Sequence, residues 1–333
     1  DGISIAKNLL LSDDVYAAIN AIKKLGIKVI VNKNECKIFG RGFNGYNYKK
    51  NLVINANNSG TLGRLILGLI INSPYPIKLI GDSSLSKRDF KRITDPLTKF
   101  GAKFKLKNRK FLPLTMFGTS NLKSIKYNEN LGSAQCKSSV IFAGMRSNGK
   151  TIIKAKKSRN HTELLSKYLK LPIQIRNKKN YDFIQISKVS KFKSFNYNIP
   201  SDISSSAFFI VLTALSNNSK LTIKNVNINS SRIGIVTILR KMGVNLTLKN
   251  KKKYKGEINA DIKIKTSKSL KAINCPTKLN SSAIDEFLVI FLTVAAKAKG
   301  ISYFRNLSEL NKKESPRLKW AEKILKMMGV KTI

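Results

Sequence analysis

The chain has 333 residues, of which 42% are hydrophobic, and its formal net charge is +45 at pH 7. This length and apolar content suffice for two domains and exclude a disordered chain. Every apolar run is broken before about 18 residues and no signal-peptide pattern is present, so we expect a soluble, cytoplasmic protein without a membrane span. With His161 as the only histidine, Asp, Glu, Lys and Arg must carry any chemistry.

Amphipathic helices that end at a glycine recur along the chain. The first follows a Ser-Asp-Asp cluster at 12–14, carries apolar residues at helical spacing from Val15 to Leu25, and ends at Gly26. A glycine at this place is typical of a left-handed residue that closes a helix. The same ending is predicted at Gly101, Gly243 and Gly329, and a copy without the glycine runs from His161 to Leu171.

A second kind of helix is apolar nearly all round, as buried helices are. The predicted buried helices cover 61–71, 138–145, 206–215 and 284–296. The short strands expected after them cover 77–80, 151–153, 221–223 and 301–304. Strand, buried helix, strand, surface helix and hairpin thus form a unit that repeats every roughly 70 to 80 residues, too long for a solenoid, and predicts an α+β fold.

Two domains built from such units follow naturally. A Lys-rich strand ends at Asn198-Ile199-Pro200, just before the third buried helix. We therefore place the first domain at residues 1–198 and the second at 199–333. We also expect the second domain to be incomplete at its end, because Ile333 stops inside what looks like a strand.

Small polar residues open each buried helix. They leave backbone N–H groups for a phosphate or carboxylate, or they are simply N-caps. Arg64 interrupts an apolar helix, so it needs an anionic partner or an exit to water. Asp285 and Glu286 open the longest apolar stretch, where they could hold an ionised base or cap a helix. Glu314 lies between Lys313 and Arg317. It either takes part in the chemistry of a site or forms only an i,i+3 ion pair with Arg317.

Six clusters, in their order and spacing, resemble those of the 5-enolpyruvylshikimate-3-phosphate synthase (3-phosphoshikimate 1-carboxyvinyltransferase) family. They are Asn-Ser-Gly-Thr at 58–61 with Arg64, Gly-Asp-Ser-Ser-Leu-Ser-Lys-Arg at 81–88, Ser-Ala-Gln-Cys-Lys-Ser at 133–138, Ser-Arg-Asn-His-Thr-Glu at 158–163, Ile-Asp-Glu-Phe at 284–287 and Lys-Glu-Ser-Pro-Arg at 313–317. The resemblance implies a two-domain enolpyruvyl transferase fold of repeated βαβαββ units. It also implies transfer of the enolpyruvyl group of phosphoenolpyruvate to the 5-hydroxyl of shikimate 3-phosphate, with release of phosphate, in chorismate and aromatic amino acid biosynthesis.

The same resemblance implies roles for individual residues. The expected ligands of shikimate 3-phosphate are Ser133, Ala134, Gln135, Arg159 and Lys313. The expected ligands of phosphoenolpyruvate are Gly60, Arg88, Gln135 and Arg317. Asp285 is the expected base at the 5-hydroxyl, and Glu314 is expected to take part in proton transfer at the enolpyruvyl methylene. No cofactor or metal is implied.

The chain departs from the family pattern in places. Pro316 stands where an Asp is usual, Asn311 where an Arg is common, and Asp89 where a Pro is frequent. A Gly-Asp-Lys-Ser-x-Ser-x-Arg segment is expected ahead of the first residue, and an Asp-His-Arg segment and a late Lys beyond the last. We therefore expect a fragment that lacks both termini and that, as residues 1–333 alone, is inactive.

Two rival functions make different predictions. The related transferase that acts on UDP-N-acetylglucosamine shares the fold but keeps a cysteine in a Gly-rich loop, where this chain has none. A nucleic-acid-binding module would explain the charge, yet it predicts basic residues clustered with exposed aromatic ones, and here lysines are spread along the chain. We expect small-molecule substrates, no nucleic acid or membrane partner, and a monomer.

Overall fold

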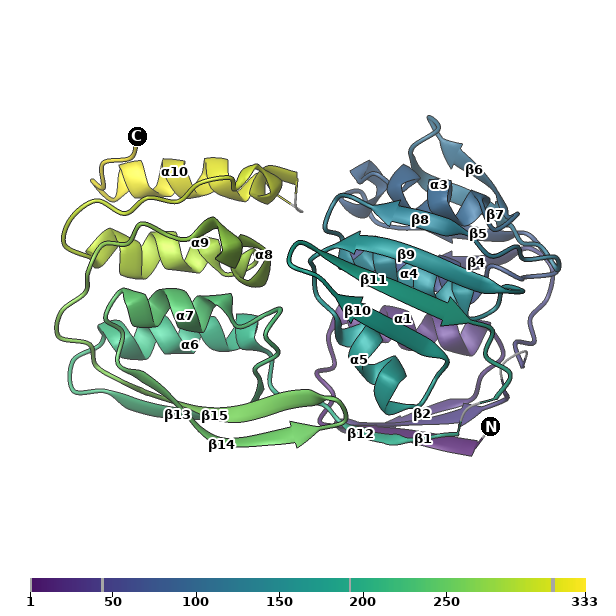
Figure 1. The fold of residues 1–333 in the computed structure, drawn as a ribbon, viewed down its shortest axis with the longest axis horizontal. Coiled ribbons are helices and arrows are strands. Elements are labelled where there is room, and N and C mark those ends of the chain that lie inside the picture. The colour runs from purple at the N-terminus through teal and green to yellow at the C-terminus, as the bar shows by residue number, and fades with distance from the viewer. Residues whose placement is uncertain (1, 43–44, 192, 313–314) are drawn as a thin grey trace. The chain divides into compact units, whose positions relative to one another are not determined.

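The computed structural model describes residues 2–42, 45–191, 193–312 and 315–333 (Figure 1). The chain divides into two compact units. The first is made of Asp1–Lys157 with Thr162–Ile199, and the second of Ser158–His161 with Pro200–Ile333. The short segment at 158–161 therefore belongs to the second unit, although the residues on either side of it belong to the first.

The first unit contains three four-stranded sheets. Their orders are β12-β1-β3-β2, β4-β5-β7-β6 and β10-β11-β9-β8. The strands are β1 (Gly2–Lys7), β2 (Val29–Asn32), β3 (Glu35–Gly40), β4 (Leu52–Asn55), β5 (Ile77–Ile80), β6 (Lys103–Lys107), β7 (Phe111–Phe117), β8 (Lys126–Glu129), β9 (Lys150–Lys156), β10 (Ile173–Asn177), β11 (Tyr181–Ser187) and β12 (Asn196–Asn198). In the second and third sheets the first two strands along the chain pair in parallel, and the hairpin that follows pairs antiparallel. The repeated βαβαββ unit is thus confirmed.

Two buried helices occupy the interior of the first unit. The helices of this unit are α1 (Asp13–Lys24), α2 (Gly60–Leu69), α3 (Lys91–Thr98), α4 (Ala134–Gly144) and α5 (His161–Tyr168), with a 3-10 turn η1 (Leu85–Lys87). Helices α2 and α4 pack so closely that a Cβ built on Gly68 would lie 2.1 Å from the carbonyl oxygen of Ser139. The Ser139 hydroxyl in turn donates to the Arg64 carbonyl at 3.1 Å. The starts of the two helices are therefore held close together.

The second unit has one three-stranded sheet of order β13-β15-β14, on which α6 and α7 lie (Figure 1). Its elements are β13 (Lys220–Asn227), β14 (Leu246–Tyr254), β15 (Glu257–Lys265), α6 (Ile203–Leu215), α7 (Gly234–Lys241), α8 (Asn280–Ala283), α9 (Phe287–Ile290) and α10 (Arg317–Met327), with η2 (Thr277–Leu279), η3 (Phe291–Ala295) and η4 (Ser308–Lys312). Its core is built from the inner faces of α6, α7 and α9 together with the sheet.

Three expectations for the second unit are wrong in detail. The helix expected at 284–296 is interrupted: α8 ends at Ala283, a turn covers 284–286, and after α9 the backbone widens into the π-helical turn η3. Glu286 lies in that turn because its buried carboxylate accepts a hydrogen bond from Ser204. The strand expected at 301–304 contributes only an isolated parallel bridge from Tyr303 to Asn274, and no strand includes Ile333.

The predicted glycine endings are confirmed. Gly26, Gly101, Gly243 and Gly329 have φ of 83°, 110°, 89° and 73°, respectively. These values lie in the left-handed region, which glycine enters without a steric penalty. Within the part of the chain that the structure describes, no helix combines the length and the apolar character needed to cross a bilayer.

Candidate functional site

Three of the four polar helix starts are N-caps. The Ser59 hydroxyl accepts the N–H of Leu62 at 3.2 Å, and the Ser133 hydroxyl accepts that of Cys136 at 3.3 Å. In the second unit the Asp202 carboxylate accepts the N–H of Ser205 at 2.8 Å. Asp285 does not occupy the N-cap position of α9, which is Glu286, and Glu286 makes no side-chain cap hydrogen bond.

The starts of α2 and α4 are joined by side-chain hydrogen bonds. Arg64 Nη1 donates to Gln135 Oε1 at 2.5 Å, and Gln135 Nε2 donates to Thr61 Oγ1 at 3.0 Å. The Arg64 guanidinium also lies 5.6 Å from the centre of the Phe90 ring. Arg64 is only 5% exposed, and the Phe90 ring next to its guanidinium group adds a cation–π contact.

Gly60 lies where two guanidinium groups approach the backbone of α2. A Cβ built on Gly60 would be 2.8 Å from Nη1 of Arg88 and 3.3 Å from Nη1 of Arg64. Arg88 directly follows η1, which positions it. Two arginines and a helix N-terminus at one glycine form an arrangement suited to a phosphate or carboxylate.

In the second unit, Asp285 is held by two arginines. It forms ion pairs with Arg159 and, at 3.4 Å, with Nη1 of Arg317, the first residue of α10. Burial, and next the nearby charge of Arg232, lowers the pKa of Arg159 to about 10. Arg159 nevertheless remains a cation at neutral pH, so Asp285 lies between two positive charges.

A second cluster lies behind Asp285. Ser204 donates to the carboxylate of Glu286, while Arg232 donates to Ser204 Oγ at 2.5 Å and to Asp202 Oδ1 at 3.1 Å. Glu286 is 2% exposed, and burial raises its pKa although Ser204 and Arg232 oppose the shift. Arg232 was not among the site residues predicted from the sequence. The rarity of arginine beside so many lysines was the available signal.

The single histidine belongs to a hydrogen-bonded group that anchors the 158–161 segment. His161 Nδ1 lies 2.5 Å from Glu257 Oε1, and Asn229 Nδ2 donates to both Glu257 at 2.8 Å and Asn160 at 2.9 Å. Burial would raise the pKa of Glu257, but His161 and the asparagine amides outweigh it and the pKa is lowered. Glu257 thus fixes the residues on the carboxyl side of Arg159.

The three departures from the family pattern have local roles. Asn311 Oδ1 accepts the N–H groups of Leu318 at 3.1 Å and Lys319 at 3.3 Å, so it caps the start of α10 while Pro316 precedes that helix. Asp89 Oδ1 accepts the N–H of Lys91 at 2.8 Å at the start of α3.

The predicted residues fall into two groups. In the first unit, Gly60, Arg88 and Gln135 gather around Arg64, with Ser133 and Ala134 in the same turn of α4 as Gln135. In the second unit, Arg159, Asp285 and Arg317 are in contact. Lys313 and Glu314 lie outside the residues that the structure describes.

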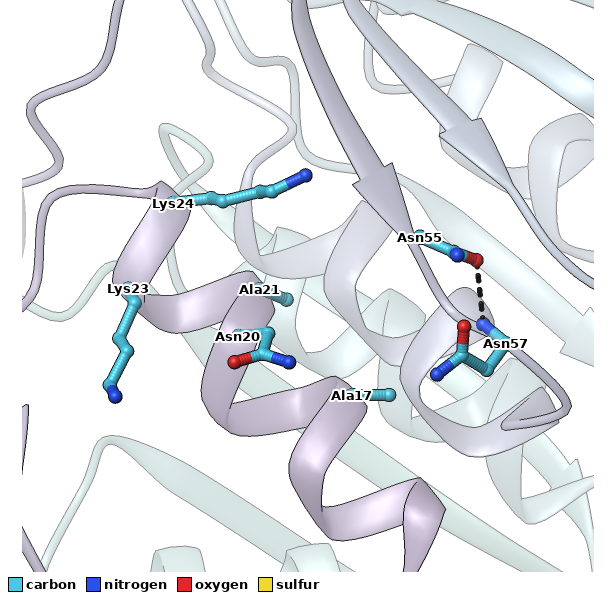
Figure 2. A pocket seen from close by; sticks show the side chains of 7 residues that line it. All are labelled: Ala17, Asn20, Ala21, Lys23, Lys24, Asn55 and Asn57. Atoms are coloured by element: carbon cyan, nitrogen blue, oxygen red, sulfur yellow. Dashed lines mark hydrogen bonds between the residues drawn. The ribbon is translucent and has the colours of Figure 1, made fainter. Parts of the chain in front are cut away.

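One hollow in the first unit lies away from these groups (Figure 2). It has a volume of about 360 Å³ and is lined by Ala17, Asn20, Ala21, Lys23, Lys24, Asn55 and Asn57. Lys24 Nζ donates to the Val53 carbonyl at 2.9 Å, and Asn57 N–H donates to Asn55 Oδ1 at 2.9 Å. The first contact ties α1 to β4, the second is local to the turn after β4, and none of the predicted site residues lines this hollow.

Comparison with known proteins gives one result. The family model described as EPSP synthase (3-phosphoshikimate 1-carboxyvinyltransferase) matches residues 1–333. The 3-phosphoshikimate 1-carboxyvinyltransferase of Ruthia magnifica subsp. Calyptogena magnifica is 38% identical over 99% of this chain and 74% of its own length. That of Thermoanaerobacter sp. (strain X514) is 36% identical over 99% and 76%. The solved EPSP synthase from Acinetobacter baumannii superposes with a TM-score of 0.86 at 33% identity, over 99% of this chain and 73% of that one. The chain belongs to the EPSP synthase family.

Proposed function

We propose that this protein transfers the carboxyvinyl group of phosphoenolpyruvate to the 5-hydroxyl of shikimate 3-phosphate and releases phosphate. Family membership supports the reaction, and the observation that carries the assignment to residues is the contact of Asp285 with both Arg159 and Arg317. One carboxylate is there placed among the cations that an enzyme for two anionic substrates needs.

The first unit supplies anion ligands. Gly60, Arg88 and Gln135 hold phosphoenolpyruvate, with Arg64 beneath them, and Ser133, Ala134 and Gln135 hold shikimate 3-phosphate. The geometry at Gly60 supports this, because the absence of a side chain lets Arg88 and Arg64 come close to the N–H groups of α2. A phosphate can then meet guanidinium and backbone donors together.

The second unit supplies the base. The oxygen of the 5-hydroxyl forms a bond to C2 of phosphoenolpyruvate, and Asp285 accepts the proton that this hydroxyl loses. At the same time the methylene carbon C3 gains a proton. The resulting tetrahedral intermediate then loses phosphate and a proton from C3, which restores the double bond. Glu314 takes part in the proton transfer at C3, Arg159 and Lys313 hold shikimate 3-phosphate, and Arg317 holds phosphoenolpyruvate.

The ion pairs of Asp285 give this scheme a substrate-controlled step. Arg159 and Arg317 are both assigned to substrate anions, and both contact Asp285. When the substrate phosphate and carboxylate engage the two guanidinium groups, Asp285 gives up part of its positive surroundings and becomes a better proton acceptor. Substrate binding therefore prepares the base.

The test uses the protein expressed from its complete reading frame. With phosphoenolpyruvate and shikimate 3-phosphate we expect stoichiometric release of phosphate and, by nuclear magnetic resonance, one enolpyruvyl ether per phosphate. UDP-N-acetylglucosamine in place of shikimate 3-phosphate should give no phosphate. Turnover of that acceptor alone would contradict the proposal.

The finer assignments complete the proposal. The enzyme acts in the cytoplasm as a monomer and binds no nucleic acid. The spread of lysines along the chain supports the last point, because no basic face with exposed aromatic residues stood out in the sequence. Light scattering of the complete protein checks that it is a monomer. Titration with a random oligonucleotide at physiological salt checks that it binds no nucleic acid.

A further inference from the structure

A buried carboxylate lies beneath the loop that leads into α4. Glu129 is the last residue of β8, and its exposed fraction is 0%. Its two oxygens accept the N–H of Leu131 at 3.0 Å and that of Gly132 at 2.9 Å. Two consecutive N–H groups thus converge on one carboxylate, in the way that backbone loops enclose a bound anion.

This carboxylate determines the shape of the loop. Gly132 has φ of 68°, in the left-handed region, and Ser133 then becomes extended and caps α4. Leu131, the large apolar side chain of the loop, is 57% exposed and gives it no anchor in the core. The hydrogen bonds to Glu129 therefore fix the conformation that places Ser133 at the helix start.

The first turn of α4 is fixed from its other side by a buried ion pair. Lys137 is 0% exposed, and its Nζ lies 2.6 Å from Oε1 of Glu163 on α5, which is 2% exposed. Next to it, the hydroxyls of Ser138 and Thr162 are 2.7 Å apart. A buried charge is costly without its partner, so this contact allows α4 little freedom to shift against α5.

Glu129 is the titratable member of this arrangement. Burial raises the pKa of Glu129, and the loop N–H groups and the Lys137 ammonium oppose the rise only in part. The other titratable groups beside it are Cys136 and Tyr127, and burial raises the pKa of each, so both remain neutral at and below neutral pH.

We propose that Glu129 is a positioning residue for the phosphorylated acceptor. Its carboxylate shapes the Leu131–Ser133 loop, while Lys137 and Glu163 fix the first turn of α4, so that Ser133 and Gln135 meet the substrate in one geometry. This inference rests on the proposed function, which assigns Ser133, Ala134 and Gln135 to shikimate 3-phosphate. Glu129 itself contacts no substrate and acts through the loop.

The test compares Glu129→Gln with the wild type, both from the complete reading frame. The amide keeps the size of the side chain but has one oxygen in place of two, so one loop N–H loses its acceptor. We expect KM for shikimate 3-phosphate to rise roughly tenfold, the equivalent of about 1.4 kcal/mol, while kcat stays within about twofold and KM for phosphoenolpyruvate, which shares only Gln135 with the acceptor, rises less. A loss of fold alone would lower kcat and active concentration without this split.

A pH profile adds a readout that a structural role would not move. As pH falls, Glu129 becomes protonated in the wild type and one oxygen ceases to accept N–H groups, so wild-type KM for shikimate 3-phosphate should rise toward that of Glu129→Gln. The substrate phosphate titrates near pH 6 in both proteins and cancels in the ratio. If the ratio of KM for shikimate 3-phosphate in Glu129→Gln to that in the wild type does not change with pH and stays close to one, the inference is overturned.

Two further variants keep the outcomes distinct. Asp261→Asn replaces a carboxylate that accepts the N–H of Asn225 at 2.9 Å in the second unit, and should leave both KM values unchanged. If Glu129→Gln does not fold, Glu129→Asp, whose shorter side chain reaches the loop less well, must still raise KM for shikimate 3-phosphate. Absence of turnover in the wild type contradicts the proposed function, whereas normal turnover with unchanged KM in the folded Glu129 variants contradicts this inference alone.

Discussion

Arginine has different partners in the two units. In the first, Arg64 contacts the Gln135 amide and the Phe90 ring, and it approaches Gly60 together with Arg88. In the second, Arg159, Arg232 and Arg317 alternate with Asp202, Asp285 and Glu286. In the second unit the carboxylates balance the guanidinium charges until a substrate competes for them. The first arrangement is suited to binding and the second to proton transfer.

The largest effect is expected at the carboxylate between two arginines. Asp285→Asn keeps the shape of the side chain but removes the base, so kcat should fall by about 10²- to 10⁴-fold with smaller changes in either KM. Steady-state phosphate release from the complete protein measures this. A variant that retained wild-type kcat would show that the second unit contributes binding only.

The next effect tests the cluster behind that base. Arg232→Met removes the guanidinium donor of the Ser204 hydroxyl and of Asp202, and with it the cation 3.9 Å from the buried Glu286, so the free energy of unfolding should fall by about 1–3 kcal/mol. Urea titration measures the change. Arg240→Met on α7, the helix that begins just after Arg232, is the control, because among the described residues Arg240 donates only to the Leu246 carbonyl and its loss should cost less. Equal losses in the two variants would contradict a role for the charge of Arg232.

A smaller effect tests the anion site of the first unit. In Gly60→Ala the new methyl group lies 2.8 Å from Arg88 Nη1, which must move, so KM for phosphoenolpyruvate should rise about tenfold while KM for shikimate 3-phosphate changes little. Gly68→Ala is the contrasting control, because its methyl group meets the Ser139 backbone and should reduce stability instead. Kinetics and thermal unfolding of both variants separate the two outcomes, and a stability loss at Gly60 with unchanged KM would contradict the prediction.

The smallest effect concerns pH. The pKa of Glu257 is lowered in the folded protein, so its ionised form adds stability above the ordinary glutamate pKa, and that stability is lost as pH falls through the lowered value. Unfolding of the wild type should therefore become easier below about pH 4.5, the ordinary range for glutamate. Glu257→Gln should be less stable at neutral pH and less sensitive to acid. Parallel pH dependence in the two proteins would exclude Glu257 as the source.

Local rules predicted most of the fold. Helix ends at Gly26, Gly101, Gly243 and Gly329 could be predicted because a left-handed residue there is a local requirement. The repeated unit followed from alternating helix types, and the structure has it as two sheets of identical strand order. The helix at 284–296 failed because Ser204, some 80 residues away, bonds to Glu286, and no local pattern contains that contact. The domain boundary at 198 and 199 stays a prediction.

The site was less accessible to sequence reasoning. Motifs predicted Gly60, Gln135 and Asp285 as members, yet their neighbours depend on tertiary contacts. Lys137 was one lysine among many until the structure placed it, fully buried, against Glu163. Glu129 ends a strand and gave no signal of its own. The sequence alone does not show which charged side chains are buried and which lie on the surface, because burial depends on tertiary contacts.

The hydrogen bond between Thr61 and Gln135 has a consequence for how the family varies. The two residues are 74 positions apart, at the same place after the N-caps Ser59 and Ser133 of successive copies of the repeated unit. Equivalent positions of two copies of the unit are thus in contact. A substitution in either copy changes the surroundings of the other, so these two positions should change in concert among relatives, as the two sides of a subunit interface do.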